Sequence, residues 1–351
     1  MLPQIPSRLI GFNAFGLCYD SQLGKTATDP RNFFEYLRAE GYPFNMVKVV
    51  CFMNSTLEVQ PNRAIPLYKT DKTINPAFLN NLLTLVNKAA EQNFLVQVCL
   101  FHYHAVQKKI YAPENMPFDL DYTNEADTVR NRLRRFFTPT LGDPYKPLQK
   151  QLVAAVGQKL KNKPNVIWEL CNEVRMDGKP SASQAEQVGD NWNLVSWLNQ
   201  MENTLKANAG DDIHVCTSTG TLSHNEKITC TNVPSTYFDF HMGQWHDTEG
   251  TYRHTIQYAR DRATQYNPNN YALICNDDGA SSVDHPTAPD WQKRTEGNVK
   301  NWAGTAFQMG LGYTTKTSYP SKEPWGIPQM RAVKFANNAN PETAQAEAKS
   351  A

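Results

Sequence analysis

The 351-residue sequence carries almost no net charge, because 35 Lys and Arg side chains offset 34 Asp and Glu and leave a formal charge of +1. Without an excess of positive charge, bulk electrostatics does not attract nucleic acid or an anionic membrane surface. The sequence also lacks the run of about 18 apolar residues that a membrane-spanning helix needs. We therefore expect neither a nucleic-acid nor a membrane partner.

The sequence has no CxxC pair among its seven cysteines. Five of them lie in apolar, strand-like segments, where a thiol acts as a small buried side chain, so neither a structural zinc site nor a disulfide framework is expected. The N-terminal segment MLPQIPSRLIGFNAF also lacks a basic stretch followed by a sustained apolar run. We expect no signal peptide in this segment, and both the cellular location and the oligomeric state stay open.

Eight short apolar or β-branched runs are present, and they alternate with longer segments of helical periodicity. This alternation is typical of βα units around a parallel sheet, and the nearly continuous apolar character of each run is typical of strands covered on both faces. The expected strands are Leu9–Phe15, Met46–Phe52, Leu95–His102, Val166–Cys171, Ile213–Ser218, Tyr237–Met242, Tyr271–Asn276 and Leu311–Thr317. We predict an α/β fold of the (β/α)₈ TIM-barrel class.

Two helices have clear start signals. The segment 29–41 begins with Asp29 as the expected N-cap and Pro30 in the first turn, and the segment 75–93 begins in the same way with Asn-Pro. The remaining helices are expected at about 146–161, 191–208, 251–266 and 290–309.

The chain length suits one decorated barrel, which we place at residues 1–336 as a single catalytic domain. Residues 103–145 form a long insertion after the third strand, and such insertions on the C-terminal side of a barrel usually shape the site. The tail 337–351 is polar and alanine-rich, without an apolar face, and is expected to be disordered.

The segment PNVIWELCNEVR carries the strongest functional signal, because an apolar strand ends directly in Asn172-Glu173. In a parallel barrel the C-terminal strand ends surround the active site, so Glu173 is expected at the mouth. The segment resembles the fourth-strand motif of the clan A glycoside hydrolases, especially the cellulase-like family 5. The resemblance implies that Asn172 binds a sugar hydroxyl and that Glu173 is the general acid/base.

In this family the second carboxylate is a glutamate at the end of the seventh strand, where this sequence reads YALICNDDGA. The resemblance implies that Asp277 takes this position, with Asp278 as a lesser candidate. Asp277 lies 104 residues after Glu173, close to the roughly 94 residues that three βα units span in an average barrel. Because aspartate is shorter, three alternatives stay open: a nucleophile, a base that activates water at an inverting site, or a position that has lost catalysis.

The resemblance also implies substrate-binding roles for residues at other strand ends, which are Asn13, Lys48, His102, His241, Trp245, Tyr313 and Trp325. Lys48 occupies the position where the family has an arginine that hydrogen-bonds the nucleophile. Lysine keeps the positive charge but lacks the guanidinium group that can donate two parallel hydrogen bonds to a carboxylate. Asn13 is equally well explained as a turn-capping amide. The family's eighth-strand tryptophan is missing, and either Tyr313 or Trp325 could supply an apolar platform for a sugar face.

The expected activity is hydrolysis of β-linked glycosides in oligosaccharides or polysaccharides, by two carboxylates and without a metal or organic cofactor. A carbohydrate-binding pseudoenzyme is the main alternative, because Asp277 departs from the family pattern. A metal-dependent amidohydrolase is a minor one, suggested by the pair His102 and His104. That pair falls on the third expected strand rather than the first, and His214 lies at a strand start, which disfavours metal binding.

Overall fold

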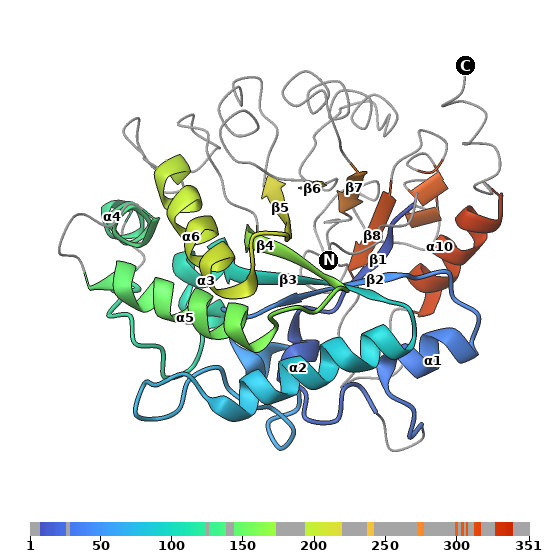
Figure 1. The fold of residues 1–351 in the computed structure, drawn as a ribbon, viewed down its shortest axis with the longest axis horizontal. Helices are drawn as coiled ribbons and strands as arrows, with labels where there is room; N and C mark the ends of the chain where they lie inside the picture. The colour runs from blue at the N-terminus through green and yellow to red at the C-terminus, as the bar shows by residue number, and fades with distance from the viewer. Residues whose placement is uncertain are drawn as a thin grey trace.

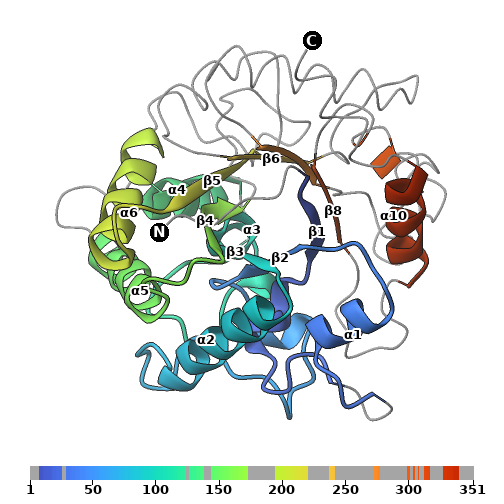
Figure 2. The ribbon, with the colours of Figure 1, turned by 45° about the vertical axis from the view of Figure 1, so that its right-hand side comes forward.

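The computed structural model describes residues 8–25, 29–123, 126–137, 144–172, 194–219, 237–241, 272–276, 299–300, 303–304, 307, 312–316 and 327–339. Eight parallel strands form one closed barrel in sequence order, and β8 pairs with β1 to close the ring. Helices surround the strands, as Figures 1 and 2 show for α1, α2, α5, α6 and α10. The predicted TIM-barrel class is therefore confirmed.

The strands lie where the apolar runs predicted them, within one or two residues at most ends. They are β1 (Ile10–Asn13), β2 (Met46–Val50), β3 (Leu95–His102), β4 (Val166–Asn172), β5 (His214–Thr219), β6 (Tyr237–His241), β7 (Ala272–Asn276) and β8 (Gly312–Lys316). The largest differences are at the C-terminal ends of β1 and β2, which each end two residues earlier than expected. Strand β1 ends at Asn13 because the following residues turn into the short 3₁₀ helix η1 (Phe15–Tyr19).

The helices described with definite bounds include one that the periodicity did not predict, α10, which follows β8. They are α1 (Phe33–Ala39), α2 (Pro76–Glu91), α3 (Tyr103–Gln107), α4 (Ala126–Phe137), α5 (Tyr145–Lys159), α6 (Leu194–Ala209) and α10 (Ile327–Ala339), with the 3₁₀ helices η2 (Ser55–Leu57) and η3 (Lys109–Tyr111). The helix expected at 251–266 lies outside the described residues, as does most of the helix expected at 290–309.

Aromatic side chains join the barrel to the helices around it. Phe12 on β1 packs against Phe33 of α1 and against Phe44, with ring centroids 5.2 and 5.7 Å apart. Further round the barrel, Phe101 on β3 contacts Trp197 of α6 at 5.4 Å. These side chains are fully or almost fully buried, so the hydrophobic core continues from the sheet into the helical layer.

The start expected for the first helix is wrong. Helix α1 begins at Phe33 rather than beside Pro30, because Asn32 is its N-cap and forms a capping box with Glu35. The Asn32 side chain accepts hydrogen bonds from the backbone N–H groups of Phe34 and Glu35, at 3.0 and 3.1 Å. Asp29 instead accepts hydrogen bonds from the guanidinium group of Arg31. The expected Asn75 cap and Pro76 start of α2 are confirmed.

Replacing Asn32 by alanine is expected to lower the free energy of unfolding by about 1 kcal/mol, within a usual range of roughly 0.5–2 kcal/mol for a lost N-cap. The substitution leaves two backbone N–H groups at the start of α1 without their side-chain acceptor. Equilibrium urea unfolding at constant m-value measures the change. Glu35→Gln is the matched control, because glutamine preserves the capping box; an equal loss in both variants would contradict this role of Asn32.

The insertion expected at 103–145 starts directly at the C-terminal end of β3 and contains α3, η3 and α4, while α5 begins at its last residue. At the other end of the chain, α10 continues to Ala339, so residues 337–339 of the expected tail are helical and 340–351 lie outside the described residues. None of the helices in the described part of the chain is long and apolar enough to cross a membrane.

Candidate active site

Four of the predicted site residues are described with their side chains, and all four lie on the first four strands. Asn13, His102 and Asn172 are the last residues of β1, β3 and β4, and Lys48 lies within β2. All four side chains are buried. Strand pairing aligns His102 with Asn172 at the C-terminal ends of β3 and β4, and it aligns Asn13 at the end of β1 with Lys48, which lies further from the strand ends, in register with Gln97.

Two further predicted site residues lie on strands in the second half of the barrel. His241 ends β6 and Tyr313 lies in β8, where the structure describes the backbone but not the surroundings of the side chains. The predictions for Glu173, Asp277, Asp278, Trp245 and Trp325 fall on positions outside the described residues.

His102 is held at the end of β3 by the chain that follows it. Its Nδ1 accepts a hydrogen bond from the backbone N–H of His104 at 3.2 Å and thereby caps α3. In a neutral ring Nε2 then carries the proton, so this nitrogen is the donor of the imidazole. The ring of Tyr111 stacks beside that of His102, with centroids 6.2 Å apart, and Phe15 contacts it edge-on at 5.9 Å. His102 is thus a fixed polar group with one defined donor.

Lys48 forms a buried ion pair that the resemblance did not predict. Its Nζ lies 2.9 Å from Oε2 and 3.2 Å from Oε1 of Glu169, and both side chains are fully buried. Gln97 on β3 donates a hydrogen bond from Nε2 to Oε2 of Glu169 at 2.9 Å. The sequence carried a signal for both partners, because each is a polar residue within an otherwise apolar strand: VQVCLF around Gln97 and VIWELC around Glu169.

Arg132 of α4 links three parts of the insertion to one another, namely α4, α3 and the loop at Asp121. This buried side chain donates from Nε to the carbonyl of Val106 at 2.8 Å, and from its other nitrogens to the carbonyls of Gln107 and Asp121. The guanidinium also lies 4.7 Å from the ring centre of Tyr122, and burial lowers the pKa of Arg132. Since α3 follows His102 directly, Arg132 steadies the segment that orients the histidine.

Metal binding has no candidate in the described part of the chain, where no group of three His, Cys, Asp or Glu side chains could hold an ion. Of the pair that suggested an amidohydrolase, His102 caps α3 and His104 shares a 2.6 Å hydrogen bond through Nδ1 with Gln107. The cysteines described with their side chains are Cys18, Cys51, Cys99 and Cys171, and all four are buried thiols. Burial raises the pKa of Cys18 and of Cys51 above the usual range, so both stay protonated.

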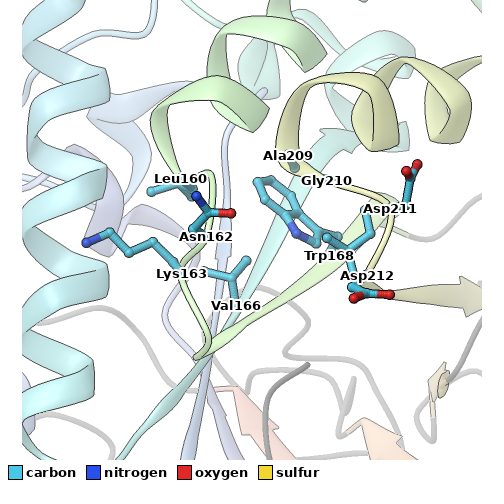
Figure 3. A pocket seen from close by; sticks show the side chains of 10 residues that line it. Leu160, Asn162, Lys163, Val166, Trp168, Ala209, Gly210, Asp211 and Asp212 are labelled. Carbon is cyan, nitrogen blue, oxygen red and sulfur yellow. The ribbon is translucent and has the colours of Figure 1, made fainter. Parts of the chain in front are cut away.

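A cavity of about 420 Å³ lies at the opposite end of the strands from these polar residues (Figure 3). Its lining includes Val166 and Trp168 in the first half of β4 and Ile213 just before β5. Lys163 and Asp211 are among the polar residues that complete the lining. Because active sites of barrels of this kind lie at the C-terminal strand ends, this cavity is separate from the candidate active site.

The closed parallel barrel defines the class of the protein as a (β/α)₈ barrel, and buried polar side chains lie at the C-terminal ends of its strands. Residues 12–315 match the family described as Cellulase (glycosyl hydrolase family 5). The chain belongs to this family, whose members are O-glycosyl hydrolases. None of the curated proteins matches the sequence closely enough to count as a relative.

Solved structures, two of them described as family 5 glycoside hydrolases, share the fold over nearly the whole chain. A mannosidase from Rhizomucor miehei is 14% identical, with a TM-score of 0.61 and coverage of 97% of this chain and 94% of the other. PbGH5A from Prevotella bryantii B14 is also 14% identical, with a TM-score of 0.57 and coverage of 94% and 96%. Endo-glycoceramidase II from Rhodococcus sp., again 14% identical, gives 0.56, with 95% and 81% covered. At 14% sequence identity, the likeness to these structures establishes the fold alone.

Proposed function

We propose that the protein hydrolyses β-linked glycosides with two carboxylates, Glu173 as the general acid/base and Asp277 as the nucleophile on the opposite face of the sugar. Protonation of the glycosidic oxygen by Glu173 makes the departing sugar a better leaving group. Attack by Asp277 at the anomeric carbon forms a glycosyl-enzyme, which water then hydrolyses with Glu173 as the base. Activation of water by Asp277, with inversion, is the alternative form of the same reaction.

The observation that carries this proposal is the end of β4. The strand runs without interruption to Asn172, which is fully buried and pairs in register with His102 at the end of β3. Glu173 is the next residue in the sequence. Two adjacent strand ends thus carry an amide donor and an imidazole donor, and a carboxylate comes next in the sequence. This supports binding of a sugar hydroxyl beside the bond that is cleaved.

The end of β7 supports the second carboxylate. Strand β7 ends at Asn276, and Asp277 follows it directly in the sequence. In the closed ring of eight strands, β4 and β7 are separated by β5 and β6, so the C-terminal ends of these two strands lie at different positions around the barrel axis. Two carboxylates on different sides of a bound sugar are the arrangement that glycoside hydrolysis needs.

The purified protein is expected to release reducing sugar from at least one β-linked polysaccharide or oligosaccharide and to retain the anomeric configuration. Related structures are named as a mannosidase and an endo-glycoceramidase, and a PbGH5A variant is described in complex with a xyloglucan tetradecasaccharide. A suitable panel therefore contains β-mannan, β-glucan, xyloglucan, a glycosphingolipid and activated aryl β-glycosides. Binding of oligosaccharides without hydrolysis of any member would contradict the proposal and favour a carbohydrate-binding pseudoenzyme.

A further inference from the structure

A buried charged network crosses three neighbouring strands below the candidate active site. Lys48 on β2 and Glu169 on β4 form the ion pair, and Gln97 on β3, between them in the sheet, donates to the same carboxylate. The side chains of Lys48 and Glu169 have no solvent exposure, and Gln97 has 1%. All three polar groups are therefore withdrawn from water inside the protein.

Such a network is a poor means of stabilising a barrel. Desolvation of a buried ion pair offsets much of its Coulomb attraction, and apolar residues of similar volume are often as stabilising or more so. Barrel interiors are mostly filled by branched apolar side chains, and the residues of β2 on the same face as Lys48 are the apolar Met46 and Val50. The presence of a charged pair at this place points to a role beyond packing.

The network lies directly below the residues proposed to bind and cleave the substrate. Glu169 precedes Asn172 on β4 by three residues, which is about 10 Å along a strand. The Nζ atom of Lys48 lies 5.9 Å from the ring centre of Phe15, and this ring contacts His102 edge-on. The ammonium group is thus close to the side chains that surround His102, in an interior where water screens its charge weakly.

We infer that Glu169 is a positioning residue for the proposed hydrolysis, because its carboxylate holds the Lys48 ammonium in one place below the strand ends. Gln97 fixes the carboxylate in turn through the hydrogen bond to Oε2. A fixed positive charge stabilises negative charge at the strand ends without reorganisation during the reaction, whereas a mobile ammonium does not. The inference rests on the proposed function. It adds Lys48, Gln97 and Glu169 to the residues that this function needs, because they hold one another in place below the bound substrate.

The decisive variant replaces both charges, as Lys48→Met together with Glu169→Leu. Removing the pair leaves no uncompensated buried charge, so the thermal unfolding midpoint is expected to stay near that of the wild type. If the ammonium acts electrostatically, kcat falls by about tenfold to a hundredfold while KM changes little. Wild-type kcat in the doubly substituted protein would overturn the inference and show that the network is only structural.

Glu169→Gln keeps the result decisive if the double variant does not fold. Glutamine matches the shape of glutamate but leaves the buried Lys48 ammonium without its counter-charge, so the unfolding midpoint is expected to fall. Measured at a temperature where the variant remains folded, kcat is expected to fall as well. Gln149→Leu is the matched control, because Gln149 bridges Trp197 and the carbonyl of Phe136 in the helical layer. This control is expected to lower the unfolding midpoint and leave kcat unchanged.

The outcomes separate the inference from the proposed function. Hydrolysis by the wild type together with a reduced kcat in both Glu169 variants supports both. Hydrolysis by the wild type with unchanged kcat in the folded variants overturns the inference alone. A wild type that hydrolyses no glycoside overturns both. A fall in kcat of the Gln149→Leu control equal to that of Glu169→Gln would also overturn the inference, since any loss of buried hydrogen bonds would then have the same effect.

Discussion

Replacing Glu173 by glutamine is expected to reduce hydrolysis of an unactivated β-glycoside by about 10²–10⁴-fold, the usual contribution of general acid–base catalysis. The amide has nearly the shape of the acid but has no proton to donate to the glycosidic oxygen. The fold is expected to remain intact, because the substitution keeps the side-chain shape and the strand that leads to this position, Val166–Asn172, is buried along its whole length. Initial rates on β-mannan or β-glucan measure the loss, and circular dichroism checks the fold.

An activated substrate provides the internal control for Glu173. An aryl β-glycoside with a nitrophenolate leaving group needs little protonation, so its first step should be slowed much less than that of a polysaccharide. Asn172→Ala is a useful comparison, because loss of the sugar-binding amide should lower kcat/KM for both kinds of substrate. Full activity of Glu173→Gln on the polysaccharide would contradict the assignment of the general acid.

The strands could be predicted from the sequence because their signal is local. A buried parallel strand needs a short, continuous apolar run, and all eight runs appear in the closed barrel. Helix boundaries are harder to predict than strands. Both Asp29-Pro30 and Asn32 are suitable first residues for α1, and the helix begins after Asn32 because this residue forms a capping box with Glu35. The helix α10 is harder to predict, because its buried face includes the small side chains of Ala332 and Ala336 while the large Phe335 is exposed, which weakens the apolar periodicity.

The polar contacts inside the barrel could be predicted only in part. Lys48 was singled out by its strand position, but its partner Glu169 lies 121 residues away in the chain. Nothing in the local sequence around Lys48 indicates which strand supplies the counter-charge. The polar residues Gln97 and Glu169 within apolar strands could have been recognised as inward-facing, whereas their contact with Lys48 follows only from the register of β2, β3 and β4.

Asp277 is the position where this sequence departs from its family, and replacing it by asparagine is expected to abolish hydrolysis. The amide neither attacks the anomeric carbon nor accepts a proton from water, so the loss is expected in both the retaining and the inverting reaction. Initial rates on the best substrate measure it. Asp278→Asn is the matched control, because it changes the neighbouring carboxylate and is expected to retain most of the activity. Loss of activity in Asp278→Asn, with activity retained in Asp277→Asn, would assign the role of second carboxylate to Asp278.

Asp277→Glu tests how the shorter side chain acts. Carboxyl groups about 5–5.5 Å apart favour direct attack, and separations of about 6.5–9.5 Å leave room for a water molecule. If Asp277 is the nucleophile, the added methylene restores the usual reach, so activity is expected to rise or a glycosyl-enzyme to accumulate. If Asp277 is a base for water, the longer side chain fills the space of that water, and activity should fall.

The stereochemistry of the first product decides between the two roles without any substitution. Attack by Asp277 is expected to retain the anomeric configuration, because two displacements occur at the same carbon, and activation of water inverts it in one. NMR of the product, recorded before mutarotation, reports the configuration directly. We expect retention in the wild type together with a gain of activity in Asp277→Glu. Inversion together with a loss in this variant would assign Asp277 as the base and Glu173 as an acid only.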